Sequence, residues 1–160
     1  MQLDHPSVRK MWKEYLDNAG ISRRNDPGHE TWCFCDNEKD ANKLAKLVLA
    51  GQKRGTTSCL EVMIQEGEPV PKPGDYSVVT DWKGVAVCVI KDEKVSVVPF
   101  DQVTEEFAAI EGEGDGSLEY WKKVHHAALS REMSSMGLVF HEETPVICEE
   151  FSVVYPGEKI

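Results

Sequence analysis

The chain has 160 residues, of which 41% are hydrophobic and 29% are charged, and its formal net charge is −10. This length and composition are typical of one soluble globular domain, and the acidic balance excludes a protein that wraps extended duplex DNA, because such binding neutralises many phosphates. No apolar run approaches the roughly 18–20 residues of a membrane-spanning helix, and the N-terminus lacks the layout of a signal peptide. We therefore expect a cytoplasmic protein, without membrane contacts, that binds a small ligand or a short RNA.

The N-terminal half is predicted to alternate helices and short strands. Apolar residues recur three and four positions apart in the helical segments, and β-branched or aromatic residues cluster in the strands. Ser7 is a candidate N-cap for the first helix. In chain order the patterns predict a helix over 7–19, a strand over 31–34, a helix over 37–50 that ends at Gly51, a strand from 56, and a short helix over 60–66.

The C-terminal half is predicted to be rich in strands. Three β-segments are separated by links of hairpin length at 81–84 and 91–94, and two helices and a last strand follow. The segments are strands over 76–79, 85–90 and 95–100, helices over 104–110 and 117–134, and a strand over 145–154. This order predicts an α+β protein built on a small, partly closed antiparallel β-barrel with surrounding helices.

The five cysteines are an odd number scattered through strand-like segments. In a cytoplasmic chain we expect them to be reduced and buried as small apolar residues. Cys33 and Cys35 form a C-x-C, which lacks the C-x-x-C spacing of zinc and redox sites. The sequence therefore predicts neither a metal site nor another cofactor. The cysteines are Cys33, Cys35, Cys59, Cys88 and Cys148.

A basic turn rich in hydroxyl groups stands out in this acidic chain. It joins a predicted helix to a predicted strand, and glycine at each side of its Lys-Arg pair allows a ligand to approach closely. Lys53 and Thr56 are three positions apart, so only a bend lets both face one pocket. The alternative is an ordinary helix end with a solvated lysine. Beside these two, the candidate ligand-binding residues of the turn are Gly51, Arg54, Thr57 and Ser58.

An acidic, glycine-rich segment follows the predicted helix over 104–110. Its spacing is similar to that of a calcium-binding EF-hand loop, but Lys122 occupies the twelfth position, where such a loop needs a bidentate acid. Two interpretations remain: a solvated acidic loop, or a Glu111 that faces inward as a general acid or base. In the next helix, Trp121 and His125 share the apolar face, where a histidine is either a core residue or part of a site.

Together these segments resemble the ASCH domain family, whose fold is similar to that of PUA RNA-binding domains. The family's G-x-K-x-x-T turn is present as Gly51, Lys53 and Thr56. A larger bacterial subgroup of uncharacterised ASCH proteins is matched at Pro73-Gly74-Asp75, at 99–115 and at 117–125. The resemblance covers roughly residues 30–155. It implies a PUA-like domain over 30–160, preceded by an N-terminal helix and linker over 1–29.

The resemblance also implies an activity. Small ASCH proteins include amidohydrolases that act on acetylcytidine, and their motifs imply a catalytic set of Lys53 as base, Thr56 as nucleophile and Glu111 as acid or base. Trp121 and His125 are further candidate ligand-binding residues. The alternatives are a non-catalytic RNA-binding module acting in transcription or translation, or a structural protein. A ribonuclease branch of the family relies on a tyrosine in the helix before the turn, and residues 37–50 contain none.

Overall fold

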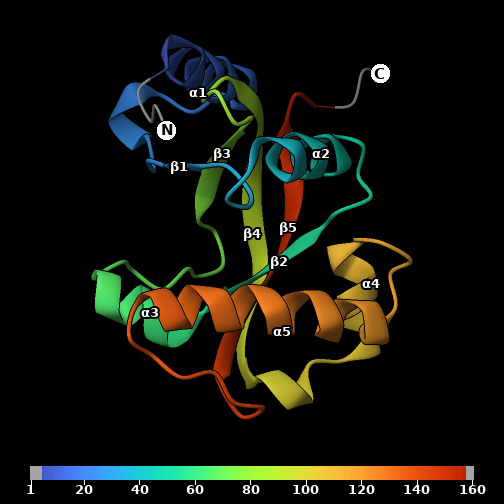
Figure 1. Ribbon diagram of the computed structural model, residues 1–160. Helices are drawn as coiled ribbons and strands as arrows, with labels where there is room; N and C mark the ends of the chain where they lie inside the picture. The colour runs from blue at the N-terminus through green and yellow to red at the C-terminus, as the bar shows by residue number, and fades with distance from the viewer. Residues whose placement is uncertain (1–4, 158–160) are drawn as a thin grey trace. The chain divides into compact units, whose positions relative to one another are not determined.

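The structure is a computed structural model that describes residues 5–157, and Figure 1 shows the order of its helices and strands. The chain forms two compact units. The first contains the residues up to Gln52, residues 73–93 and the residues from Phe151 onward. The second contains residues 53–72 and 94–150. The long strands β4 and β5 each contribute residues to both units.

The first unit holds two α-helices that begin and end as their terminal residues dictate. The His5 side chain, and not the predicted Ser7, caps α1 by accepting from Ser7 N, and Asn37 caps α2 by accepting from Asp40 N. Gly20 ends α1 in the left-handed conformation that glycine favours. The elements are α1 (Pro6–Ala19), a 3-10 turn η1 (Arg23–Asn25), β1 (Glu30–Trp32), α2 (Glu38–Leu49), β3 (Tyr76–Thr80) and parts of β4 (Ala86–Pro99) and β5 (Pro145–Tyr155).

The second unit holds three α-helices and the short strand β2. Thr104 caps α4 by accepting from Phe107 N, and Ser117 caps α5 by accepting from Tyr120 N. These caps bear out the helix starts predicted from the sequence. The elements are β2 (Gly55–Cys59), α3 (Leu60–Glu66), a 3-10 turn η2 (Phe100–Gln102), α4 (Glu105–Glu111) and α5 (Leu118–Ser135), with the remaining parts of β4 and β5.

The strands form one mixed sheet in the order β1-β3-β4-β5-β2. The pairs β3–β4 and β2–β5 are antiparallel, whereas β1 runs parallel to β3, so the sheet is not wholly antiparallel. The predicted link at 91–94 is wrong, because β4 continues from Ala86 to Pro99. Asp92 keeps the strand regular there: its N–H donates to Asp75 O, and its carbonyl accepts from Gly74 N.

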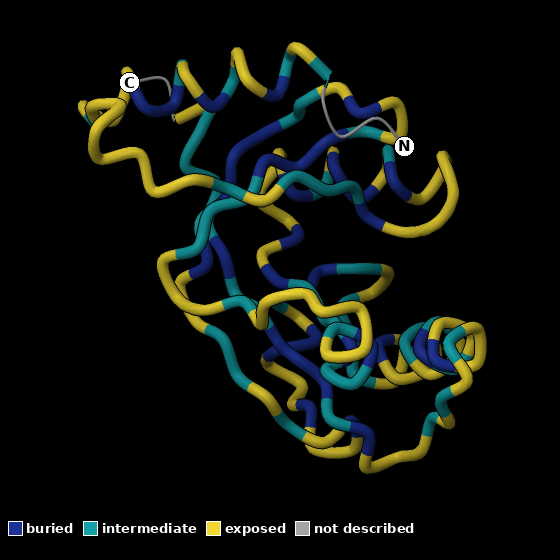
Figure 2. Tube along the Cα trace, turned by 90° about the vertical axis from the view of Figure 1, so that its left-hand side faces the viewer, coloured by how far each residue is buried: buried dark blue, intermediate teal, exposed yellow. Residues whose placement is uncertain are grey.

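Apolar side chains of each unit form their own core, and Figure 2 shows buried and exposed positions alternating along the helices. In the first unit, α1 packs on Val78 and Val89, while α2 packs on Val79, Cys88 and Ile90. The core of the second unit contains residues of β2, α3, α4 and α5, together with Val146 and Cys148 from the first half of β5. Its most deeply buried members are Phe100, Met133, Val146, Ala108 and Cys59.

The cysteines are less uniformly buried than predicted. Cys59, Cys88 and Cys148 are buried, and burial raises the pKa of the Cys88 and Cys148 thiols to about 12. Cys35 is exposed and has a positive φ of 61°, because the chain turns sharply before α2. Among residues 5–157, no helix combines the length and apolarity that crossing a lipid bilayer requires.

Candidate functional site

The backbone around β2 draws Lys53 into the interior of the second unit. Arg54 N donates to Ile110 O at 2.8 Å, which ties the start of β2 to the end of α4. Position 55 must be small, because a Cβ there would lie 3.0 Å from both Glu149 O and Ile110 Cγ2. Lys53 is only 1% exposed, and its Nζ donates to Gly55 O at 2.8 Å. The glycine thus lets α4 close over the lysine.

Two carboxylates face the buried ammonium. Lys53 Nζ lies 3.0 Å from Glu113 Oε2 and 3.9 Å from Glu111 Oε1. Glu111 is the last residue of α4 and is 1% exposed, whereas Glu113 is 20% exposed. Gly112 lies between them in the left-handed conformation, with φ of 68°, and reverses the chain so that Glu113 reaches the same lysine. The ammonium therefore lies between an inner and an outer acid.

His125 completes this group from α5. Its Nδ1 lies 2.9 Å from Trp121 O, and its Nε2 lies 3.1 Å from Glu111 Oε2. A carbonyl and a carboxylate only accept hydrogen bonds, so both ring nitrogens act as donors when the ring is an imidazolium. The imidazole also stacks on the Trp121 ring, with centroids 4.3 Å apart and planes 17° apart. We call Lys53, Glu111, Glu113 and His125 the charge cluster.

The electrostatics of the charge cluster favour the ionised forms of Glu111 and His125. Burial alone raises the pKa of the Glu111 carboxyl, but the charge of Lys53 and the hydrogen bond from His125 outweigh it and hold that pKa below 4.5. Burial alone lowers the pKa of His125, but the hydrogen bond and charge of Glu111 outweigh it and raise that pKa above 6.5. Two cations then balance two carboxylates, as buried charges require.

The hydroxyl group beside the cluster belongs to Thr57, the neighbour of the predicted Thr56. The Thr57 side chain contributes to lowering the pKa of Glu111, and its Oγ1 is buried without a hydrogen bond of standard geometry among the described residues. Successive residues of a strand point to opposite faces, so Thr56 and Ser58 lie on the other face of β2 from Thr57. The strand register supports this, because Thr57 pairs with the buried Cys148 and Thr56 pairs with Glu149.

Three buried polar atoms around the cluster lack a hydrogen bond of standard geometry within the described part of the chain. They are Thr57 Oγ1, Glu111 Oε2 and Trp121 Nε1. Glu111 Oε2 still has the ionic contact with His125. Buried polar atoms nearly always have partners, and exceptions concentrate where water, a ligand or chemistry takes part. The three atoms belong to β2, α4 and α5.

The cluster also has the ligand types of a metal site. One ligand atom each from Glu111, Glu113 and His125 lies within 4.8 Å of the other two. Lys53 Nζ, however, is already 3.0 Å from Glu113 Oε2. A divalent cation among these atoms would be repelled at short range by the ammonium. The arrangement therefore fits Lys53 as its resident cation better than a metal ion.

The structure brings five of the predicted site residues together: Lys53, Thr57, Glu111, Trp121 and His125. Arg54 contributes its backbone to the α4 contact while its side chain is exposed. Gly51 belongs to the first unit, where it follows α2 and its C-cap Ala50, with φ of 81°. Sequence reasoning missed Glu113, which it assigned to a solvated acidic loop. The available signal was its position between two glycines directly after Glu111.

The comparisons with known proteins agree with this architecture. The family model described as ASCH domain matches residues 30–155. An ASCH domain structure from Lactobacillus crispatus is 36% identical, with a TM-score of 0.84 over 94% of this chain and 96% of that one. Protein EF3133 from Enterococcus faecalis is 30% identical, with a TM-score of 0.83 over 92% and 88% of the two chains. These matches confirm the predicted family and the α+β fold.

A more distant structure and the curated proteins add little about function. The hypothetical protein PH0355 is 19% identical, with a TM-score of 0.51 over 77% of this chain and 98% of that one, which is a likeness of fold alone. None of the curated proteins matches the chain.

Proposed function

Since the chain belongs to the ASCH domain family, we propose that its charge cluster is the centre of a site for a nucleoside-like or RNA-derived ligand. The proposed activity is hydrolysis of the amide bond of an acylated cytidine-type nucleoside in the cytoplasm. The observation that carries the proposal is the 3.9 Å approach of Lys53 Nζ to Glu111 Oε1, from segments far apart in the sequence.

The geometry favours a different division of roles from the one that the family resemblance implied. A base must accept a proton, but Lys53 Nζ already lies in ion pairs, 3.0 Å from Glu113 Oε2 and 3.9 Å from Glu111 Oε1. As an ammonium it is suited to donate to the carbonyl oxygen, where negative charge develops in the transition state. Glu111, beside the Thr57 hydroxyl and His125, is suited to accept the hydroxyl proton.

The proposed reaction has two steps. A threonine oxygen attacks the amide carbonyl carbon, its proton passes through Glu111 to the leaving amine, and an acyl-enzyme ester forms. Water then attacks the ester, which releases the carboxylic acid and restores the hydroxyl. Thr57 is the nucleophile that the position of Glu111 favours, and Thr56 is the one that the family motif favours.

Substrate access to the cluster leads past Glu113. Lys53 and Glu111 are each 1% exposed, while the side chains of His125 and Glu113 are 13% and 20% exposed. Glu113 is flanked by Gly112 and Gly114, both with positive φ. The Glu113 carboxylate thus occupies the place beside Lys53 Nζ where a substrate carbonyl or phosphate oxygen would accept a hydrogen bond. Substrate binding therefore requires the Glu113 carboxylate to move away from Lys53 Nζ.

The test is turnover of acetylcytidine by the purified protein and by single variants. We expect Thr57→Ala to lower kcat/KM about 100-fold or more, and Lys53→Met to do the same, because each removes a group used in the transition state. Thr56→Ala compares the two candidate nucleophiles, and Ser58→Ala on the same face as Thr56 is the matched control. Cytidine release at the uncatalysed rate by the unaltered protein would end the enzyme proposal.

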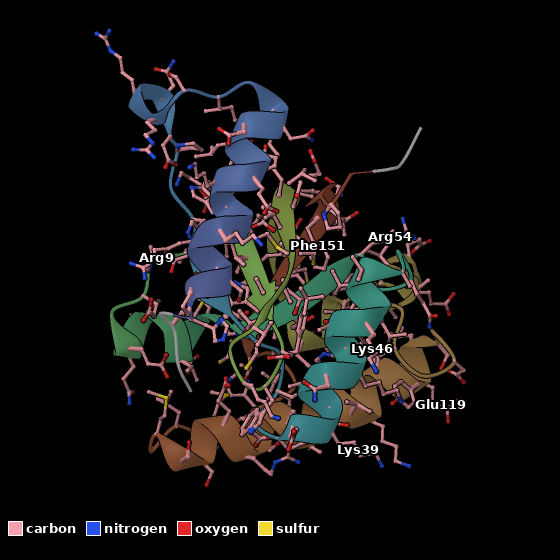
Figure 3. All side chains as sticks on the ribbon, turned by 90° about the horizontal axis from the view of Figure 1, so that it is seen from above. Arg9, Lys39, Lys46, Arg54, Glu119 and Phe151 are labelled. Carbon is pink, nitrogen blue, oxygen red and sulfur yellow. The ribbon has the colours of Figure 1, made fainter. Side chains whose placement is uncertain are left out.

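The second candidate is an RNA-binding module without chemistry. It is favoured by Arg54, whose exposed side chain extends outward directly after the buried lysine (Figure 3). This version predicts association with a short RNA that weakens steeply with salt and is reduced by Arg54→Gln. Binding that is independent of both salt and Arg54 would exclude it. Extended duplex DNA is not a partner in either version, given the net charge of −10.

A further inference from the structure

A groove in the first unit lies apart in sequence from every residue of the charge cluster. It is formed by α1 and the segment after it, and its volume is about 430 Å³. That volume falls within the range of about 300–1,000 Å³ that is usual for small-molecule sites. Its lining residues are Arg9, Trp12, Lys13, Leu16, Asp17, Ile21, Ser22, Arg23, Asp26 and His29.

The cations of the groove are available to a ligand. Arg9, Lys13 and Arg23 are exposed, and the ion pairs found among residues 5–157 involve none of them. Figure 3 shows the Arg9 side chain extending away from the axis of α1. The lining thus holds three cations against two acids, Asp17 and Asp26, in a chain whose net charge is −10. The three cations favour an anionic ligand.

One of the two acids in the groove is already engaged. Asp26 Oδ1 and Oδ2 accept from Trp12 Nε1 at 3.1 and 3.2 Å, and Asp26 Oδ1 also accepts from Gly28 N at 2.8 Å. These donors hold the carboxylate in place and offset its charge. Asp17 is the remaining acid, against three cations.

A flat ring forms part of the same lining. His29 is half-buried, and its ring centroid lies 4.6 Å from that of Trp12, with the planes tilted by 48°. His29 Nδ1 donates to Glu30 O at 2.9 Å, which fixes the orientation of the imidazole. An oriented aromatic ring next to cations is the combination that recognises a base together with its phosphate.

From this juxtaposition we infer that the groove binds a nucleoside monophosphate unit, either as a free nucleotide or as the phosphorylated end of an RNA chain. Arg9, Lys13 and Arg23 hold the phosphate, and His29 supports the base. All ten lining residues precede residue 30, where the match to the family model begins. The ASCH domain model therefore does not account for this site.

The experiment is a titration of the full chain at low salt with AMP, adenosine and inorganic phosphate, followed by NMR. The indole N–H resonance of Trp12 reports the groove directly, because that group donates to Asp26 in its wall. We expect AMP to bind at least tenfold more tightly than either adenosine or phosphate and to shift this resonance. AMP that binds no better than adenosine, or that leaves the Trp12 resonance unmoved, would overturn the inference.

Charge-neutralising variants identify the residues involved. Arg9→Gln and Arg23→Gln are each expected to weaken AMP binding about tenfold, the usual scale for losing a hydrogen bond to a charged group. Lys10→Gln and Arg24→Gln are matched controls, since both side chains are exposed neighbours outside the groove lining. Equal effects of the two sets would contradict the site.

Two further experiments address separate questions. The first asks whether the ligand is a free nucleotide or an RNA end, and the second asks whether the groove binds independently of the charge cluster. A short 5′-phosphorylated oligoribonucleotide that binds at least as tightly as AMP identifies an RNA end, and AMP alone identifies a free nucleotide. Thr57→Ala, which removes the proposed nucleophile, should leave AMP binding unchanged, so the groove and the proposed amide hydrolysis succeed or fail separately. Loss of AMP binding in this variant while it remains folded would contradict a site in residues 9–29.

Discussion

The charge cluster of the second unit and the groove of the first unit use charged side chains in opposite ways. In the cluster, Lys53 and Glu111 are 1% exposed, and each cation has a carboxylate within 4 Å. In the groove, Arg9, Lys13 and Arg23 are exposed and have no such partner in the described part of the chain. Charges in the cluster therefore contribute to the stability of the fold, whereas charges in the groove contribute little to it.

The largest effect is expected from Lys53→Met. The substitution leaves Glu113 without its ion pair and Glu111 with His125 alone, and breaking a buried ion pair in this way costs about 3–5 kcal/mol. Denaturant unfolding of the variant against Lys123→Met, an exposed lysine on α5, measures the difference. A loss below about 1 kcal/mol would contradict the buried ion pairs.

Gly55→Ala is expected to be the next most severe change. The added Cβ would approach Glu149 O and Ile110 Cγ2 to 3.0 Å and would push α4 away from β2. Overpacking of this kind costs about 1–3 kcal/mol. Gly157→Ala is the control, because its Cβ would have no neighbour within 4 Å. If the two variants unfold alike, α4 does not depend on a glycine at position 55.

The stability of the second unit is expected to depend on pH on both sides of a window. The lowered pKa of Glu111 contributes stability above its ordinary value of 4.5, which is lost as the pH falls through the folded-state pKa. The raised pKa of His125 contributes stability below its ordinary value of 6.5, which is lost as the pH rises through the folded-state pKa. This pair therefore stabilises the fold most between about pH 4.5 and 6.5.

Unfolding free energies measured from pH 4 to 9 check the window. His125→Gln should flatten the decline on the alkaline side, and Glu111→Gln should flatten the acid side. If the unfolding free energy of His125→Gln still declines unchanged at alkaline pH, the decline is due to another titrating group.

A smaller loss is expected from Glu113→Gln, about 1–2 kcal/mol, because the amide oxygen still accepts a hydrogen bond from Lys53. The position is also 20% exposed, so water replaces part of the lost interaction. Comparing the unfolding free energies of Glu113→Gln and Lys53→Met in the same denaturant series distinguishes the contribution of the outer acid, Glu113, from that of the inner acid, Glu111. A loss of stability as large as that of Lys53→Met would show that Glu113 contributes as much to the ion pairs of Lys53 as the buried Glu111 does.

The smallest effect is expected from Arg9→Gln and Lys13→Gln in the groove. Exposed side chains without ion pairs usually change stability by less than about 0.5 kcal/mol. The melting temperature of each variant checks this. A marked destabilisation would show that the groove cations serve the fold, and it would remove the contrast between the two regions.

Much of the local structure was predictable because it depends on neighbours in sequence. The caps at Thr104 and Ser117 and the glycine stops at Gly20 and Gly112 follow from side-chain and φ preferences that act within four residues. The continuous strand β4 was not predictable, since residues 91–94 read as a turn. Their extended conformation depends partly on Asp92 pairing with Gly74 and Asp75, which are distant in sequence.

The candidate site shows the same division. The sequence by itself determined the family and the helix ends, and it singled out Lys53, Glu111 and His125 as candidates, because these depend on local spacing and composition. Only the tertiary structure decided that Thr57 faces Glu111 and that Glu113 joins the cluster. The reason is physical. Which face of a strand a side chain lies on, and where a glycine turn directs the chain, depend on the elements that pack against them, here α4 packing on β2 over the buried ammonium of Lys53.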